Sequence, residues 1–336
     1  MNKHRDMILA VVGILLLGFV ASRVGVQSVV KELAAVRAGI AIIIALSLVR
    51  LMMQTRSWAI SLRLDGLHCS TGKLMLVRLA SRGMGYLTVL GPVASEPMKI
   101  RLLRQHGKSP TAATLVDTGV YWFASGIVGI GGCLAVCVLL ARSPRAVASA
   151  VASAAILAAT FIAGLFTIAR PSLLLAPLGD RLGERCPRWL RKAGQIEMAV
   201  RQFARQDRAA IRQMLLLDLG CQVLVAAEVA TVFWFLRLPV HAGIILGLEA
   251  ASRMVEMASG WLPARIGADE SGAAGAFLSF GLPAAAGVTL ALARRTRDLL
   301  ACLVGLAWLA WVSRQTAGGS AEARSERGGS HVEAFG

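Results

Sequence analysis

The chain has 336 residues, of which 56% are hydrophobic and 16% are charged, and its mean hydropathy is +0.64. Because a soluble domain carries about 25% charged residues, this composition excludes an ordinary soluble protein and predicts an all-α bundle that crosses the membrane several times. The net charge of +17 does not indicate a nucleic-acid partner, since the basic residues fall beside apolar runs, where they set topology and meet the anionic headgroups of membrane lipids. The six cysteines and five histidines are scattered, so we predict no metal site and no cofactor.

The N-terminal quarter of the chain contains the first two predicted spans. Basic residues precede the apolar run 7–21, an arrangement that can mimic a secretory signal. Since the rest of the chain is itself polytopic, we expect an uncleaved first span in a bacterial-type inner (plasma) membrane, with the N-terminus in the cytoplasm. A short amphipathic connector over 23–37 leads to the second span, 38–53, and Trp58 is predicted to anchor its end at the membrane interface.

The stretch 78–106 is too apolar at its centre for a surface loop and too broken for a plain span. Arg78 and Arg82 lie four residues apart and therefore on one helix face. Glycines and prolines interrupt the segment that follows. Irregular backbone at membrane depth survives only where it lines a cavity or is buried in protein, so we predict a re-entrant hairpin whose ionisable groups are functional. The other ionisable residues of this hairpin are Glu96, Lys99 and Arg101.

A long basic segment separates the two halves of the chain. Residues 111–140 form the predicted third span, with Asp117 near its start, and residues 147–169 form the fourth. Residues 170–212 carry ten basic and four acidic residues, which places this segment in the cytoplasm by the positive-inside rule. It is either an amphipathic helix on the membrane surface or a solvated loop that only fixes topology.

The fifth and sixth apolar runs carry acidic residues at membrane depth. Glu228 lies near the middle of the fifth span, 214–236, where an ionised carboxylate costs about 3 kcal/mol and needs a partner or a cavity. The run 242–260 places three charges on one helix face, which indicates either a neutralised network or a polar substrate path. These three residues are Glu249, Arg253 and Glu256.

The C-terminal part contains a second broken segment, 261–275, with Asp269 and Glu270 at its end. Two more spans are predicted over 276–293, with a kink or break at Pro283, and over 299–312. Four charged residues lie between these two spans, namely Arg294, Arg295, Arg297 and Asp298. The prediction is thus an integral membrane domain over 1–313, with halves 1–169 and 213–313 around the basic loop and about seven to eight spans, followed by a disordered tail over 314–336.

The two broken segments occupy corresponding places in the two halves. Paired, interrupted apolar segments indicate a transporter-like site at an inverted repeat, where helix N-termini and nearby bases suit an anionic group. If the second hairpin enters from the opposite side of the membrane, the C-terminus lies outside. One more ordinary crossing would place it inside, and both topologies remain open.

Two sequence motifs resemble a known family. LGPVASEPMKIRLL (90–103) is similar to the Pro-x-x-x-Gly-Glu-x-x-(Lys/Arg) pattern of the flippase-like membrane family that includes the transmembrane region of lysylphosphatidylglycerol synthases. LPARIGADESG (262–272) is similar to the second pattern of that family, Pro…Gly-x-x-Glu, and Glu96 and Glu270 match its two glutamates. The segments 248–272 and 294–308 also resemble its hopanoid-biosynthesis-associated subgroup. Ser95 replaces the usual glycine before the first glutamate. No soluble acyltransferase-like domain follows the last span, so we expect no lipid lysinylation by this chain alone.

The leading hypothesis is a lipid-handling, flippase-like transporter of a phospholipid or a hopanoid-type lipid. Arg78, Arg82, Lys99 and Arg101 would hold an anionic headgroup by charge, and Glu96 and Glu270 would cap helices or pair with these bases. Glu228, Glu249, Arg253 and Glu256 would line the path. A purely structural role for each of these residues stays open. Without a nucleophile constellation or nucleotide loop we do not expect an enzyme; the alternative is a non-catalytic membrane subunit or scaffold for lipid-biosynthesis enzymes.

Overall fold

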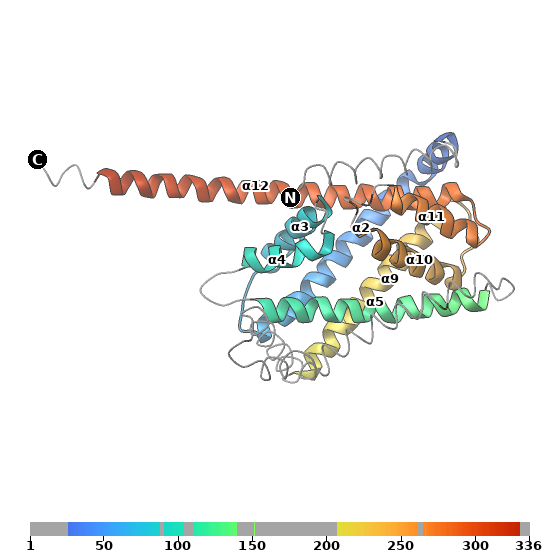
Figure 1. Ribbon diagram of the computed structural model, residues 1–336, viewed down its shortest axis with the longest axis horizontal. Helices are drawn as coiled ribbons and strands as arrows, with labels where there is room; N and C mark the ends of the chain where they lie inside the picture. The colour runs from blue at the N-terminus through green and yellow to red at the C-terminus, as the bar shows by residue number, and fades with distance from the viewer. Residues whose placement is uncertain are drawn as a thin grey trace, which may run out of the picture.

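The computed structural model describes residues 26–87, 91–103, 110–139, 207–260 and 267–329, together with Val151, Leu262 and Arg265. Within these ranges the chain is entirely helical (Figure 1). The described helices are α2 (Val26–Leu64), α3 (Thr71–Leu87), α4 (Gly91–Leu103), α5 (Thr111–Leu139), α9 (Arg208–Phe235), α10 (Ala242–Ser259), α11 (Ala268–Ser279) and α12 (Ala284–Gly329). The predicted spans 7–21 and 147–169 and nearly all of the basic loop lie outside the described residues.

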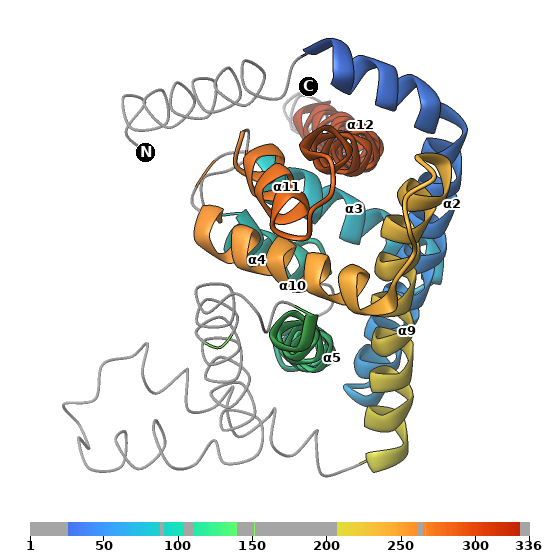
Figure 2. The ribbon, with the colours of Figure 1, turned by 90° about the vertical axis from the view of Figure 1, so that its right-hand side faces the viewer.

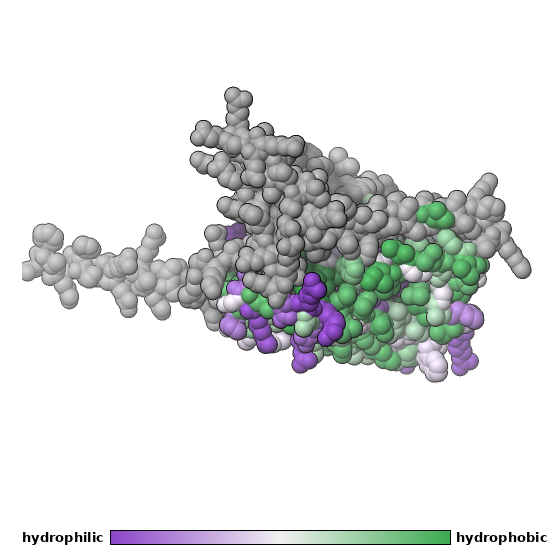
Figure 3. Space-filling model, turned by 90° about the horizontal axis from the view of Figure 1, so that it is seen from below, coloured by the Kyte–Doolittle hydropathy of each residue, from purple (hydrophilic) through white to green (hydrophobic). Residues whose placement is uncertain are grey.

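Three helices are long and apolar enough to cross a membrane. They cover Ala34–Leu64, Thr111–Leu139 and Arg208–Phe235, so an all-helical membrane fold is confirmed. The last two agree closely with the predicted spans 111–140 and 214–236. The outer surface fits this placement, because Figure 3 shows a broad hydrophobic face with hydrophilic residues gathered at its ends. Large apolar side chains such as Val138 and Trp234 are exposed.

Several predicted boundaries are corrected. The predicted span 38–53 is only the middle of α2, and Trp58 lies fully buried in the core instead of at the interface. The spans 276–293 and 299–312 are also wrong, because α11 ends at Ser279 and α12 is one continuous helix from Ala284. The break near Pro283 is confirmed: Gly281 adopts a positive φ of 71°, and the Leu282 N–H donates back to the Phe277 carbonyl, which ends α11.

Two other regions are more helical than predicted. Gly83 and Gly85 of the first hairpin lie inside α3, and Gly91 and Pro97 belong to α4, so these residues do not interrupt the helices that contain them. The helix α12 continues to Gly329, in contrast to the predicted disordered tail over 314–329. A helix that is already formed is extended at little cost by Ala, Arg, Glu and Gln. Residues 330–336 lie outside the described part of the chain.

Two sets of helices run in opposite directions, α2 to α5 in the first half of the chain and α9 to α12 in the second. In Figure 1, α5 runs from left to right below the short helices, whereas α12 runs from right to left above them. Each follows a helical hairpin, α3–α4 or α10–α11, and each packs against the hairpin of the other half: α3 on α12 and α10 on α5. The helices α2 and α9 pack against each other along one side of the bundle (Figure 2). This exchange of partners is the arrangement expected of an inverted repeat.

A polar layer separates two apolar clusters in the interior. One cluster includes Trp58 and Met214 beside the first hairpin, and the other includes Ile43 and Phe233 beside the second. Between these positions α2 and α9 carry buried or half-buried polar side chains, namely Arg50, Gln54, Asp218, Gln222 and Glu228. The polar layer therefore lies near the middle of the two spans, at the depth where transporters of inverted-repeat design hold their substrates.

Candidate functional site

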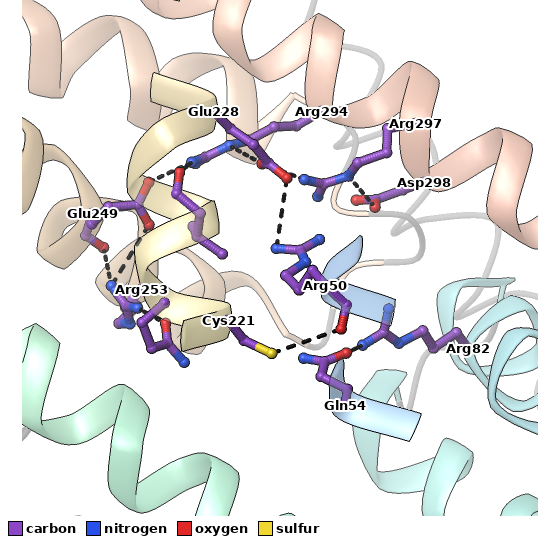
Figure 4. Close-up of polar contacts among 12 residues, drawn as sticks. Arg50, Gln54, Arg82, Cys221, Glu228, Glu249, Arg253, Arg294, Arg297 and Asp298 are labelled. Atoms are coloured by element: carbon purple, nitrogen blue, oxygen red, sulfur yellow. Dashed lines mark hydrogen bonds and ion pairs between the residues drawn. The ribbon is translucent and has the colours of Figure 1, made fainter. Parts of the chain in front are cut away.

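Glu228 on α9 is the centre of the polar layer. Its side chain is fully buried and faces three arginines, with Arg50 of α2 at 3.9 Å and Arg294 of α12 at 3.6 Å. Arg297, one turn further along α12, also donates to Glu228 (Figure 4). The expectation that this carboxylate needs a charged partner is met by residues from two other helices, which offset the cost of burying it.

A second carboxylate extends the contacts to α10 and α5. Arg294 donates to Glu249, and Arg253 lies 3.6 Å from the same carboxylate. The Arg253 guanidinium also donates to Ser125 on α5 at 2.8 Å and to Gln222 on α9. One connected set of polar contacts thus joins α2, α5, α9, α10 and α12.

Arg82 of α3 approaches this set from the first hairpin. It donates to Gln54, which lies one turn after Arg50 on α2, and Figure 4 shows Arg82 and Arg50 in the same polar interior. Arg82 interacts electrostatically with both Arg50 and Asp298, and Asp298 accepts from Arg297 at 3.0 Å. We call the connected residues the central network; its charged members are Arg50, Arg82, Arg253, Arg294, Arg297, Glu228, Glu249 and Asp298.

The central network contains five arginines and three carboxylates among the described residues. The side chains of Arg50, Arg253, Arg294 and Arg297 are only 10–17% exposed. In addition, the Nε groups of Arg50 and Arg294 are buried without a hydrogen-bond partner within the described structure, as is the Oε1 atom of Glu228. Buried donors normally find an acceptor, so this surplus of positive charge and free donors fits an anion supplied from outside the chain.

The first hairpin holds a separate cluster around Trp58. Arg78 pairs with Asp117 of α5, and Lys99 pairs with Glu96 at 2.7 Å. Both cations lie over the indole ring, at 5.4 Å for Arg78 and 5.8 Å for Lys99. Asp218 of α9 accepts from Ser57 at 3.2 Å nearby, and it interacts electrostatically with both Asp117 and Arg78. Because each cation already has a carboxylate, this cluster fixes the hairpin against α2 and α5.

The second hairpin has its own acidic cluster. Glu270 is fully buried, accepts from the Gly267 N–H at 2.9 Å and pairs with Arg295 of α12 at 2.9 Å. It therefore caps α11, and its basic partner comes from α12 and not from the first hairpin. Arg265 pairs with Glu256 at 3.0 Å and Asp269 at 3.5 Å. Glu256 therefore faces Arg265. This differs from the prediction that Glu256 shares one helix face with Glu249 and Arg253.

The predicted site residues thus divide into three groups. Arg82, Glu228, Glu249 and Arg253 meet in the central network, Arg78, Glu96 and Lys99 meet around Trp58, and Glu256 and Glu270 lie in the second hairpin. Arg101 is exposed on α4. Sequence reasoning assigned Arg50, Arg294 and Arg297 to the ends of spans. One sequence feature could have placed them inside helices. Each of these arginines has apolar sequence on both sides and no glycine or proline nearby, which is typical of a charged turn inside one helix.

Comparison with known families agrees with the predicted resemblance to the transmembrane region of lysylphosphatidylglycerol synthases. The family model described as the lysylphosphatidylglycerol synthase TM region matches residues 7–305, a range that includes both hairpins and the whole central network. No curated protein and no solved structure matches the chain. The match covers most of the chain, and three helices are able to span a membrane. The protein therefore belongs to the membrane family of the lysylphosphatidylglycerol synthase transmembrane region.

Proposed function

We propose that the protein is a lipid-handling membrane protein that takes the anionic headgroup of a phospholipid into the central network and moves it between leaflets without chemical change. The observation that carries this proposal is the surplus of arginine over carboxylate at the centre of the bundle. Family membership supports it, because the family is named for the membrane region of the synthases of a phospholipid, lysylphosphatidylglycerol.

Arg50 and Arg82 are the best placed residues to hold the headgroup. Arg50 reaches its carboxylate only at 3.9 Å and retains a free Nε donor, whereas Arg82 donates to an uncharged amide. A guanidinium binds a phosphodiester through two parallel hydrogen bonds, which neither a lysine nor a carboxamide can reproduce. Glu228 and Glu249 then orient the remaining arginines and limit the positive charge of the empty site.

The charge of the site favours a phospholipid over a hopanoid-type lipid. A neutral, hydroxyl-bearing headgroup would leave the surplus positive charge at membrane depth uncompensated. The crossing of α3 on α12 and of α10 on α5 places both hairpins beside the network, so opposite movements of the two halves would open it to either side.

The test is lipid transfer in proteoliposomes of the full chain, measured with fluorescent phosphatidylglycerol and phosphatidylcholine. We expect faster transfer of phosphatidylglycerol, and a loss of about tenfold or more in Arg50→Gln and Arg82→Gln, because a hydrogen bond to a charged group contributes about 1.5–3 kcal/mol. Arg37→Gln, on an exposed position of α2, is the matched control and should transfer lipid normally.

Two results would count against the proposal. Equal transfer of both lipids by the native protein and by the arginine variants would show that the network does not recognise a headgroup. A folded protein that transfers no lipid above protein-free vesicles would contradict transport itself and leave the role of a non-catalytic subunit or scaffold for a lipid-biosynthesis enzyme.

A further inference from the structure

A second candidate binding site lies on the surface, at the end of α2 and the start of α9. A cavity of about 530 Å³ opens there, and an adjoining cavity of about 360 Å³ shares three of its lining residues. The shared residues are Ile60, Arg63 and Gln213, so the two cavities form one groove between the helices. We call it the α2–α9 groove. Its position at one end of two spans, seen low in Figure 1, is where lipid headgroups meet water.

The groove is lined by arginines and by apolar residues, and both helices contribute residues of each kind. Arg56 and Arg63 lie seven residues apart on one face of α2, about 10 Å along the helix, and Arg212 faces them from α9. All three arginines are exposed, and no carboxylate of the described residues pairs with them. The apolar wall includes Ile60 and the strongly exposed Leu216.

One acidic residue, Asp207, also lines the groove and offsets at most one of its three positive charges. Asp207 precedes α9 and accepts hydrogen bonds from the N–H groups of Ala209 at 2.9 Å and Ala210 at 3.0 Å. Its carboxylate is therefore engaged as the cap of α9. The groove keeps a local surplus of positive charge beside an apolar wall, which is the combination that matches a charged headgroup joined to acyl chains.

This groove is distinct from the central network. Arg56 and Arg63 point outward, whereas Arg50, on another face of the same helix, points inward to Glu228. The basic residues at this end of α2 and α9 also place it on the cytoplasmic side by the positive-inside rule, where the leaflet is rich in anionic lipid.

We propose that the α2–α9 groove binds one anionic phospholipid of the cytoplasmic leaflet, with the phosphate between Arg63 and Arg212 and the acyl chains along Ile60 and Leu216. The occupant is a lipid and not a soluble phosphate. The apolar wall lies at the end of two spans, where it can contact acyl chains, but it would not contribute to binding a free anion. This site does not depend on the proposed transport function: it would hold lipid in a protein that transfers none.

The test is native mass spectrometry of the full chain in detergent, titrated with phosphatidylglycerol or phosphatidylcholine. We expect one phosphatidylglycerol to bind preferentially, with affinity falling about fivefold for each arginine removed, since one basic residue contributes about 1 kcal/mol near an anionic surface. The variants are Arg63→Gln, Arg212→Gln and the double change. Arg208→Gln is the matched control, because Arg208 is exposed on the first turn of α9 but does not line the groove.

The arms of the experiment separate the alternatives. An equal effect of Arg208→Gln would show only a general surface charge and overturn the proposal, as would equal binding of the two lipids. Competition by millimolar inorganic phosphate that displaces the lipid completely would assign the site to a soluble anion instead. Adding Arg50→Gln keeps the two proposals distinguishable, because that change should leave the preferential groove lipid in place.

Discussion

At the residue scale, the central network shows how a membrane bundle keeps charge at its centre. Glu228 has no exposed surface and interacts with Arg50, Arg294 and Arg297 from two other helices. A buried ion pair is weak evidence for stability as a whole, but the removal of one partner leaves an uncompensated charge. The carboxylate is thus more sensitive to substitution than any exposed acid.

Glu228→Gln should therefore destabilise the fold by about 3–5 kcal/mol, the usual cost of breaking a buried pair. Thermal unfolding of the detergent-solubilised protein measures it. Glu256→Gln is the matched control, because Glu256 is 55% exposed and its loss should change stability by less than about 1 kcal/mol. A double variant that also carries Arg297→Gln should recover part of the loss. If the Glu228→Gln variant unfolds at the same temperature as the unchanged protein, the carboxylate does not balance the charge of the arginines.

At the element scale, glycines allow the crossings between the two halves. A side chain at Gly132 of α5 would meet the Leu246 carbonyl oxygen of α10 at 2.2 Å, and one at Gly305 of α12 would meet the backbone of Leu79 on α3 at 2.3 Å. The two crossings correspond to each other in the repeat, and each uses a glycine for close approach. Small residues have this role throughout helical membrane proteins, where packing replaces the hydrophobic effect between helices.

Gly132→Ala should lower stability by about 1–3 kcal/mol, because the new methyl group collides with backbone that cannot rotate away. The neighbouring Gly131 has nothing within 4 Å of its added carbon, so Gly131→Ala is the matched control. It should be neutral or gain up to about 1 kcal/mol from helix propensity. Thermal unfolding in detergent compares the two. Equal effects of both changes would mean that α5 and α10 do not pack as closely as the structure shows.

Gly305→Ala tests the corresponding crossing of α12 on α3. The same collision predicts a loss of about 1–3 kcal/mol. If the two crossings are equivalent, this loss should be close to that of Gly132→Ala, and the two changes should add in the double variant because the sites share no partner. A Gly305 variant as stable as the native protein would contradict the packing of the C-terminal helix on the first hairpin.

The limits of the sequence prediction follow from the same elements. The helix α5 was predicted to within one residue, and α9 was predicted to within six residues at its start and one at its end, because each is a continuous apolar run. The helix α12 was divided in two because its charges at 294–298 look like a loop in a local window. Their partners, Glu228 and Glu249, lie 45–69 residues earlier in the chain, so only the folded structure shows that Arg294 and Arg297 are neutralised inside a helix. Half of the site was therefore beyond local reasoning.

At the scale of the whole molecule, the exchange of partners between the halves implies a definite topology. The segment between α2 and α3 and the segment between α9 and α10 are equivalent in the repeat, and α2 and α9 run in opposite directions in Figure 1. The two segments should therefore lie on opposite sides of the membrane. By the positive-inside rule, the basic residues around the first predict that it lies in the cytoplasm, and the second should then face outward.

Thiol labelling of single-cysteine variants tests this topology in intact cells. His68→Cys, between α2 and α3, and Val240→Cys, between α9 and α10, both fall at exposed positions, which should leave the fold intact in a background without native cysteines. A membrane-impermeant maleimide should label the cysteine at position 240 in intact cells and the one at position 68 only after permeabilisation. Labelling of both from the same side would mean that the repeats are parallel, and the central network would then have no two-sided access through which a headgroup could pass.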